Sequence, residues 1–175
     1  AAGAAKLPAT GHTGWRRRNA LVALGRMRAP EVIPALSHAL EDHHAETRMA
    51  AVRGLGRLGL PEAAIPILER VIIGELNLPP TQLQNALLNC CRWRPGMMVP
   101  YLRKATDDTR ALLARVLGEI ATGELDEDLL LLAYDPLPDV RAAAARALGE
   151  ARLTTALSAL GTLATDTEWF VRLRA

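Results

Sequence analysis

Small and apolar residues recur at helical spacing along most of the chain. Around Arg141, for example, Val140, Ala144, Ala145 and Leu148 fall at positions that lie on one face of an α-helix. A glycine ends such a segment, and a second apolar segment follows after a short break. Glycine suits the end of a helix, so the pattern predicts pairs of helices joined by tight turns.

The second helix of a pair is often opened by proline, which is tolerated in the first helical turn because its missing N–H has no partner there. These helices are expected at residues 30–40, 61–73 and 95–105. Further prolines follow four or five residues into them, at Pro34, Pro66 and Pro100. An internal proline removes a helical hydrogen bond, so we expect each to bend its helix or to shift the start.

The first helices repeat one motif, which begins with Arg and ends eight residues later with Gly. Full copies lie at residues 17–25, 48–56, 110–118 and 141–149. A degenerate copy at residues 84–92 has Cys90 and Cys91 where the others end in Leu-Gly, and a truncated copy begins at Arg172. The starts at 17, 48, 84, 110, 141 and 172 give intervals of 31, 36, 26, 31 and 31 residues. Repetition at this period indicates a stacked solenoid.

Composition agrees with an all-α fold. Half of the 175 residues are hydrophobic but 3% are aromatic, so the core must consist of Ala, Leu, Val and Ile. Ala and Leu favour helices, and the chain is long enough to bury a substantial core.

The run from Asp139 to Gly149 resembles the HEAT-like repeats, also called phycobilisome-lyase-type repeats, and the resemblance covers about residues 15–175. It implies a right-handed α-α superhelix of about five helical hairpins plus the start of a sixth. We expect residues 1–14 to form a flexible tail rich in Ala and Gly, and residues 15–175 to form a repeat domain that is truncated at its C-terminus and belongs to a longer protein. The family includes scaffolds, adaptors, chromophore lyases and some enzymes, so the fold alone does not decide the function.

A recurrent aspartate precedes the repeated arginine by six residues, as in Asp42 and Arg48, Asp135 and Arg141, Asp166 and Arg172. The resemblance suggests a structural role between repeats for these residues and for Arg110. The aspartate can cap a helix, and the arginine can bridge to the next hairpin. The alternative is that these arginines point into solvent and bind a phosphate or carboxylate ligand.

The formal net charge of +2 gives no general case for nucleic-acid or membrane binding. A nucleic-acid-binding module remains an alternative, because HEAT-like DNA glycosylases use basic surfaces and this chain has two local basic clusters. One consists of Arg16, Arg17 and Arg18, and the other consists of Arg92 and Arg94. The first cluster also suits the polar end cap of a solenoid or a basic segment beside a membrane. No apolar run approaches the roughly 18 residues of a membrane span.

Two other groups of residues could carry chemistry. Three histidines and three acidic residues cluster between two repeats: His38, Glu41, Asp42, His43, His44 and Glu46. This cluster could form a partial metal site, or it could be a solvated loop without metal. Adjacent Cys90 and Cys91 could provide a nucleophile or a bilin attachment point, but their place in the repeat predicts packing in the core. We therefore assign no catalytic, cofactor-binding or metal-binding residue.

The long interval contains an inserted loop at residues 74–80, and insertions in solenoids often mark the binding face. We expect a partner to bind near this loop and the second helices, with Trp93, Met97, Met98 and Tyr101 as candidate contacts. The alternatives are that the loop is a tolerated surface insertion and that these side chains belong to the core. The leading hypothesis is a non-catalytic protein-interaction scaffold, either in the cytoplasm or at the cytoplasmic face of a membrane protein. A nucleic-acid-binding module and a lyase-like enzyme are the alternatives.

Overall fold

The computed structural model describes residues 12–122, 125–151 and 154–175, which form helices joined by short turns. The first helices of the hairpins are α1 (His12–Arg26), α3 (Ala45–Leu58), α5 (Pro80–Cys91), α7 (Asp107–Ile120) and α9 (Pro138–Ala151). The second helices are α2 (Ile33–Ala39), α4 (Pro61–Ile72), α6 (Val99–Lys104), α8 (Asp126–Leu132) and α10 (Leu157–Leu163). Short 3-10 turns precede three of these: η1 (Pro30–Val32), η2 (Pro95–Met98) and η4 (Thr154–Ala156). Finally, α11 (Trp169–Arg172) begins a sixth repeat.

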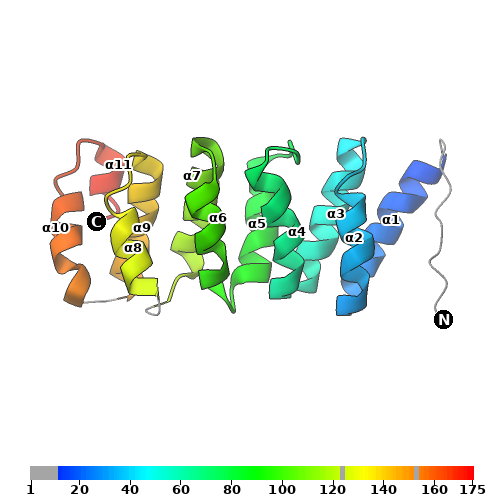
Figure 1. Ribbon diagram of the computed structural model, residues 1–175, viewed down its shortest axis with the longest axis horizontal. Helices are drawn as coiled ribbons and strands as arrows, with labels where there is room; N and C mark the ends of the chain where they lie inside the picture. Colours follow the sequence, from blue (N-terminus) through cyan, green and yellow to red (C-terminus); the bar gives the residue numbers. More distant parts are fainter. Residues whose placement is uncertain (1–11, 123–124, 152–153) are drawn as a thin grey trace.

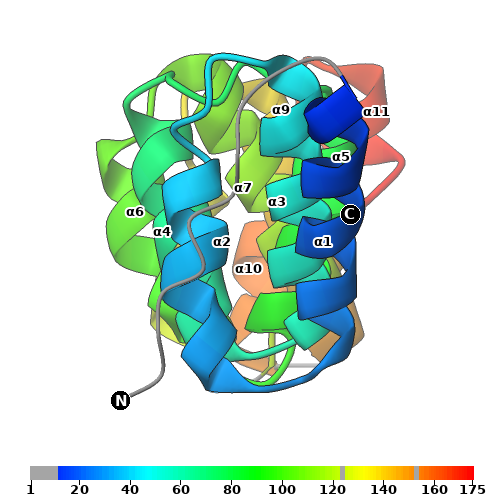
Figure 2. The ribbon, with the colours of Figure 1, turned by 90° about the vertical axis from the view of Figure 1, so that its right-hand side faces the viewer.

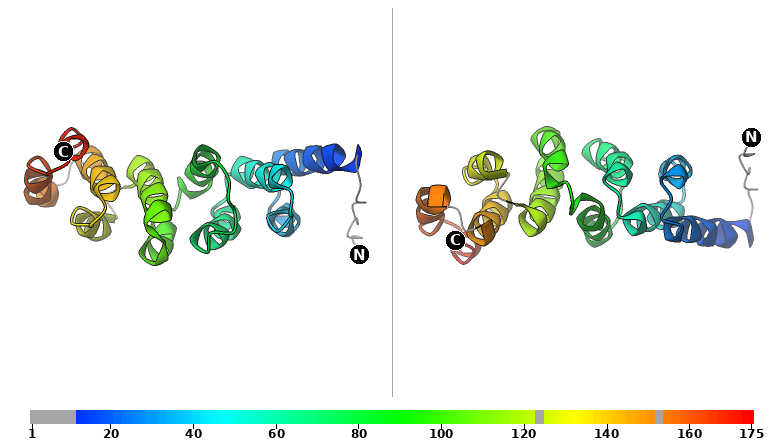
Figure 3. Two further views of the ribbon diagram at one scale, coloured as in Figure 1. Left: turned by 90° about the horizontal axis from the view of Figure 1, so that it is seen from above. Right: turned by 90° about the horizontal axis from the view of Figure 1, so that it is seen from below.

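The hairpins stack side by side into an elongated row (Figure 1). Viewed along the row, α1, α3, α5 and α9 lie on one side, and α2, α4 and α6 lie on the other (Figure 2). The views from above and below show the same two-layered stack (Figure 3). This arrangement confirms the all-α solenoid of five hairpins and the start of a sixth. Most of the expected tail lies outside the described residues, and α1 already begins at His12.

Prolines set where several second helices begin. Pro34 and Pro100 each lie in the first turn of an α-helix, with a 3-10 turn before it. The expected shift of these helix starts is confirmed, because the chain avoids placing either proline where a helical N–H is needed. Pro66 instead remains inside α4, where it removes one helical hydrogen bond.

The core consists mainly of Ala, Leu, Val and Ile side chains between the two layers. The motif glycines were expected to end the first helices, but Gly56, Gly118 and Gly149 lie inside α3, α7 and α9. Some of these small residues let neighbouring first helices approach closely. A Cβ atom added at Gly118 of α7 would lie 2.8 Å from the carbonyl oxygen of Ala143 in α9. At the equivalent position of the next repeat, a Cβ at Gly149 would meet no atom within 4 Å.

Three arginines of the first helices pair with the aspartate in the turn that opens the next repeat. The pairs are Arg17–Asp42 at 3.0 Å, Arg110–Asp135 at 3.7 Å and Arg141–Asp166 at 2.7 Å. Arg141 binds both carboxylate oxygens of Asp166, a geometry that strengthens an ion pair. We call this series the arginine ladder. Arg110 and Arg141 bridge to the next hairpin as expected, and Arg17, which the sequence placed in a basic cluster, does the same.

Three of the arginines at the marker position also hold the turn of their own repeat. Each of the three donates from Nη1 to the backbone carbonyls five and six residues earlier. These bonds join Arg48 to Asp42 and His43, Arg141 to Asp135 and Pro136, and Arg172 to Asp166 and Thr167, at 2.6–3.1 Å. One guanidinium can therefore fix its own turn and reach the next one.

The aspartates do not cap helices in the way that the sequence suggested. In Asp42, Asp135 and Asp166, Oδ1 accepts the backbone N–H two residues further on, at 2.8–2.9 Å. A bond from the N–H two residues further on defines an Asx turn. The aspartate lies before the N-cap position, as Asp42 does before His44 and Asp166 before Glu168, so it does not cap the helix. The turn presents the carboxylate to the arginine of the preceding repeat.

The ladder is interrupted at the third repeat. Gln84 stands at the marker position of α5, and Lys104 stands where the other turns carry aspartate. Arg48, one repeat earlier, reaches the backbone carbonyl of Leu76 at 3.4 Å instead of an aspartate. Contact between α5 and α7 is also less extensive than between α3 and α5 or between α7 and α9. These features indicate that the third repeat is coupled to the fourth less strongly than the regular repeats are coupled to each other.

Replacing Gly118 tests the close approach of the first helices. Gly118→Ala should lower the free energy of unfolding by about 1–3 kcal/mol, because the new methyl group would clash with the backbone of α9. Gly149→Ala is the matched control and should leave stability unchanged or raise it by up to about 1 kcal/mol, since Ala favours helix. Urea denaturation followed by circular dichroism measures both. Equal losses in the two variants would contradict the explanation.

Acid titration tests the ladder at Asp166. Hydrogen bonds from Arg141 and from the Glu168 N–H lower the pKa of this carboxyl from 3.8 to about 2. The depressed pKa stabilises the fold above about pH 4, and that contribution is lost as the pH falls towards 2. Asp166→Asn should therefore lower the free energy of unfolding at neutral pH by about 1.5–3 kcal/mol and flatten its decrease between pH 4 and 2. Asp108→Asn, at an exposed residue without an ion pair to any described residue, should do neither.

Candidate partner-binding groove

The inserted loop between α4 and α5 folds inward and becomes part of the core. Its Leu76 and Leu78 side chains are buried, while Gly74 and Asn77 adopt positive φ angles of 74° and 34°. Glycine takes such an angle without steric cost, and asparagine tolerates it better than most residues. The loop therefore turns twice and carries two leucines to the layer of first helices.

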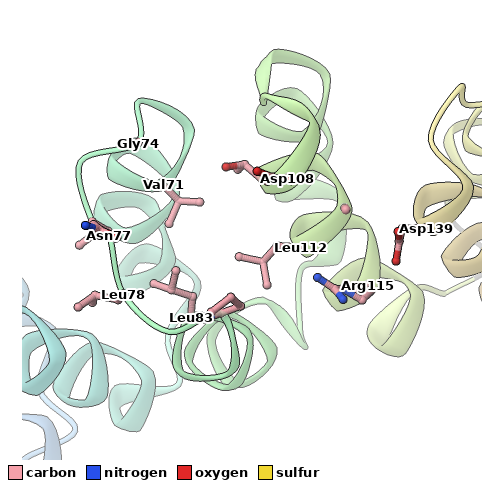
Figure 4. Close-up of a pocket in the computed structure, with 13 residues that line it drawn as sticks. Val71, Gly74, Asn77, Leu78, Leu83, Asp108, Leu112, Arg115 and Asp139 are labelled. Carbon is pink, nitrogen blue, oxygen red and sulfur yellow. The ribbon is translucent and has the colours of Figure 1, made fainter.

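A pocket of about 520 Å³ lies between this loop and α7. Figure 4 shows the loop on one side, α7 on the other, and Leu83 at the start of α5 beneath them. Apolar side chains form much of the lining, including Val71, Leu78, Leu83 and Leu112. A concave site of this size, with apolar side chains beside polar ones, can bury one or two large side chains of a ligand.

Polar and charged residues form the rim of the pocket. Asn77 comes from the loop, Asp108 and Arg115 come from α7, and Asp139 comes from the first turn of α9. Asp108, Arg115 and Asp139 are exposed and form no ion pair with any residue that the structure describes. Their charges are therefore available to orient a ligand above the apolar floor.

A second pocket of about 200 Å³ adjoins the first. Both are lined by Arg115 and Asp139, so they meet at these side chains. The second pocket continues past Arg146 of α9 to Phe170 and Arg174 at the end of the stack. We call the two pockets together the first-helix groove; it crosses repeats three to six on their first helices.

The candidate contacts from the sequence do not line this groove. Met98 is fully buried and belongs to the core, so its assignment as a surface contact is wrong. Met97 and Tyr101 are half-buried against the core, and burial together with the charge of Glu69 raises the pKa of Tyr101. Trp93 is 81% exposed, just beyond the end of α5.

The inserted loop lines the larger pocket together with Val71 of α4, whereas most of the helical lining comes from first helices and not from the second helices that the sequence suggested. The second-helix side does carry a pocket of about 250 Å³ between α6 and α8, crossed by the Arg103–Asp128 ion pair at 2.8 Å. The larger groove lies on first helices and uses Leu83, Leu112 and Arg115. No sequence signal marks these groove residues. Leu112 resembles any core leucine, and Arg115 stands at a repeat position that Arg53 also occupies, so neither differs from its counterparts.

The two basic clusters lie far apart in the fold. Arg17 pairs with Asp42 and Arg18 pairs with Glu46, while Arg16 is exposed. Figure 1 shows α1 starting at the upper edge of the stack, whereas α5 ends at the lower edge. Arg92 and Arg94 follow the end of α5 and are exposed. The clusters therefore do not combine into one basic groove.

The cysteines are part of the core. Cys90 and Cys91 are buried and free, and Cys90 Sγ donates to the carbonyl of Leu55 in α3 at 3.3 Å. Burial raises the pKa of both thiols to about 12. A thiol that stays protonated at neutral pH is a poor nucleophile, which agrees with the packing role that was expected.

Among the described residues, no helix is long and apolar enough to cross a membrane.

Comparison with known proteins places the repeats in a family. A family model for HEAT repeats matches residues 14–75 and 97–175. The unmatched stretch, residues 76–96, contains part of the inserted loop and all of α5, where the arginine ladder is interrupted. A search of curated proteins finds no match. The spacing of the helical hairpins, their arginine ladder and this match agree, and the chain belongs to the HEAT-repeat family.

Proposed function

We propose that this chain is a non-catalytic scaffold that binds a partner protein in the first-helix groove. The groove carries the proposal because it combines an apolar floor with charged side chains that have no ion pair among the described residues. Protein interfaces have this anatomy, with an apolar centre and a polar rim. HEAT repeats commonly serve as protein-interaction surfaces, which supports the same conclusion.

A protein partner fits the surface better than a nucleic acid. A nucleic-acid site needs several adjacent cations to neutralise phosphates. The two basic clusters lie at opposite edges of the stack, and two of the five arginines are already paired with carboxylates. The groove rim carries both signs of charge, through Asp108, Asp139 and Arg115. Such a rim favours a protein segment with polar groups of both kinds.

The enzyme alternative receives little support from the cysteines. A lyase-like reaction needs an accessible thiolate, whereas both thiols are buried with pKa values near 12. The non-catalytic role and the cytoplasmic location both stay predictions.

A charge reversal on the groove rim tests the proposal. Arg115→Glu should reduce the amount of partner protein captured from lysate of the source organism by at least about fivefold, because it changes the charge pattern above the apolar floor. Arg53→Glu is the matched control, since Arg53 is exposed and stands at the same repeat position in α3, five residues after Arg48. Capture by Arg53→Glu should equal that of the unchanged protein.

The capture is run at low and high salt after nuclease treatment, and circular dichroism confirms that both variants are folded. Proteins retained after nuclease treatment and lost in Arg115→Glu alone would support the groove. Equal capture by both variants would place the binding surface elsewhere. Retention of nucleic acid that disappears at high salt would favour the nucleic-acid alternative.

A further inference from the structure

The turn between α2 and α3 brings three possible metal ligands together. They are Asp42, His43 and His44, which are consecutive in the sequence. The Asp42 carboxylate is 3% exposed, whereas the His43 and His44 side chains are 84% and 68% exposed. One oxygen donor is thus held in the fold, and two imidazoles lie beside it at the surface.

Both imidazoles direct the same nitrogen at the same oxygen. Asp42 Oδ1 lies 3.1 Å from Nδ1 of His44 and 3.8 Å from Nδ1 of His43. The three ligand atoms all lie within 4.8 Å of one another, and the ring centroids are 3.9 Å apart. Ligands at about 2.0–2.2 Å from a tetrahedral zinc ion are separated by about 3.3–3.6 Å. The observed spacings bracket that value, so small side-chain rotations would suffice.

The arginine ladder already orients the carboxylate. Arg17 binds Asp42 Oδ2 at 3.0 Å, and the backbone N–H of His44 donates to Oδ1 at 2.8 Å. Ligating carboxylates are commonly fixed in this way by hydrogen bonds outside the coordination shell. Because Arg17 occupies Oδ2, a metal ion would meet Oδ1 alone. The positive charge of Arg17 weakens binding but leaves the ligand in place.

We propose that Asp42, His43 and His44 bind a divalent transition-metal ion such as Zn²⁺, with one coordination position open to solvent. Two imidazole nitrogens and one carboxylate oxygen suit zinc or its first-row neighbours, whereas magnesium and calcium prefer oxygen ligands. Each bound imidazole is neutral and carries its remaining proton on Nε2. This site is independent of the groove, and it joins the second repeat to α1 through Arg17.

Calorimetric titration of tag-free protein with ZnCl₂ tests the site. We expect saturable binding of one ion per chain, and no comparable binding of MgCl₂. His43→Ala and His44→Ala should each weaken zinc binding by at least about tenfold, because each removes one of three ligands. Both histidines are exposed, so neither variant should disturb folding, which circular dichroism checks.

His38→Ala is the matched control, since His38 is an exposed histidine of the same region that faces Glu41 at 3.4 Å and not Asp42. It should bind zinc like the unchanged protein. With Co²⁺ as a spectroscopic probe, the visible absorption of a tetrahedral site should appear and should be absent in His44→Ala. The proposal is overturned if the unchanged protein shows no one-to-one binding, or if His38→Ala weakens binding as much as the other two variants. Partner capture through the groove is unaffected by either result.

Discussion

Pairing between an arginine of one repeat and an aspartate of the next is the interaction on which the stack depends. A guanidinium has several donors in a fixed plane, so one side chain can hold two backbone carbonyls and a carboxylate together. Arg141 does this, binding the carbonyls of Asp135 and Pro136 as well as both oxygens of Asp166. Each such contact sets the position of the following hairpin. Since the hairpins touch mainly their neighbours, order passes along the chain one interface at a time.

Where this pairing fails, the stack opens into a concave surface. The third repeat lacks the arginine and the aspartate of the ladder, and the inserted loop supplies a backbone carbonyl to Arg48 in their place. Two loop leucines fill part of the space beside α5, and the remainder is the larger pocket. The HEAT-repeat model also leaves this stretch unmatched. A departure from the repeat pattern and the candidate binding site therefore have one structural cause.

The first interface uses the same interaction for a different purpose. Burial raises the pKa of Asp42, but hydrogen bonds from His44 and the charge of Arg17 outweigh it, so the pKa is lowered overall. The carboxylate stays ionised and fixed, and its second oxygen is available to the two histidines at the surface. A structural ion pair can in this way also prepare a ligand for a metal ion.

Local patterns in the sequence were sufficient for the fold and for its regular interfaces. Helical spacing, Pro at helix starts and the 31-residue period predicted the hairpins, and the recurrent Asp and Arg predicted the links between them. The motif glycines proved to lie inside the first helices, where several serve close packing, and not to end them. Each of these signals acts within one repeat or between adjacent repeats, so it can be read directly from spacing. The groove could not be predicted in this way. Leu83, Leu112, Arg115 and Asp139 come from three different first helices, and Met98 looked like a surface contact until packing placed it in the core. Which side chains meet across the irregular repeat depends on how the inserted loop and α5 pack against α7, and only the tertiary structure decides that.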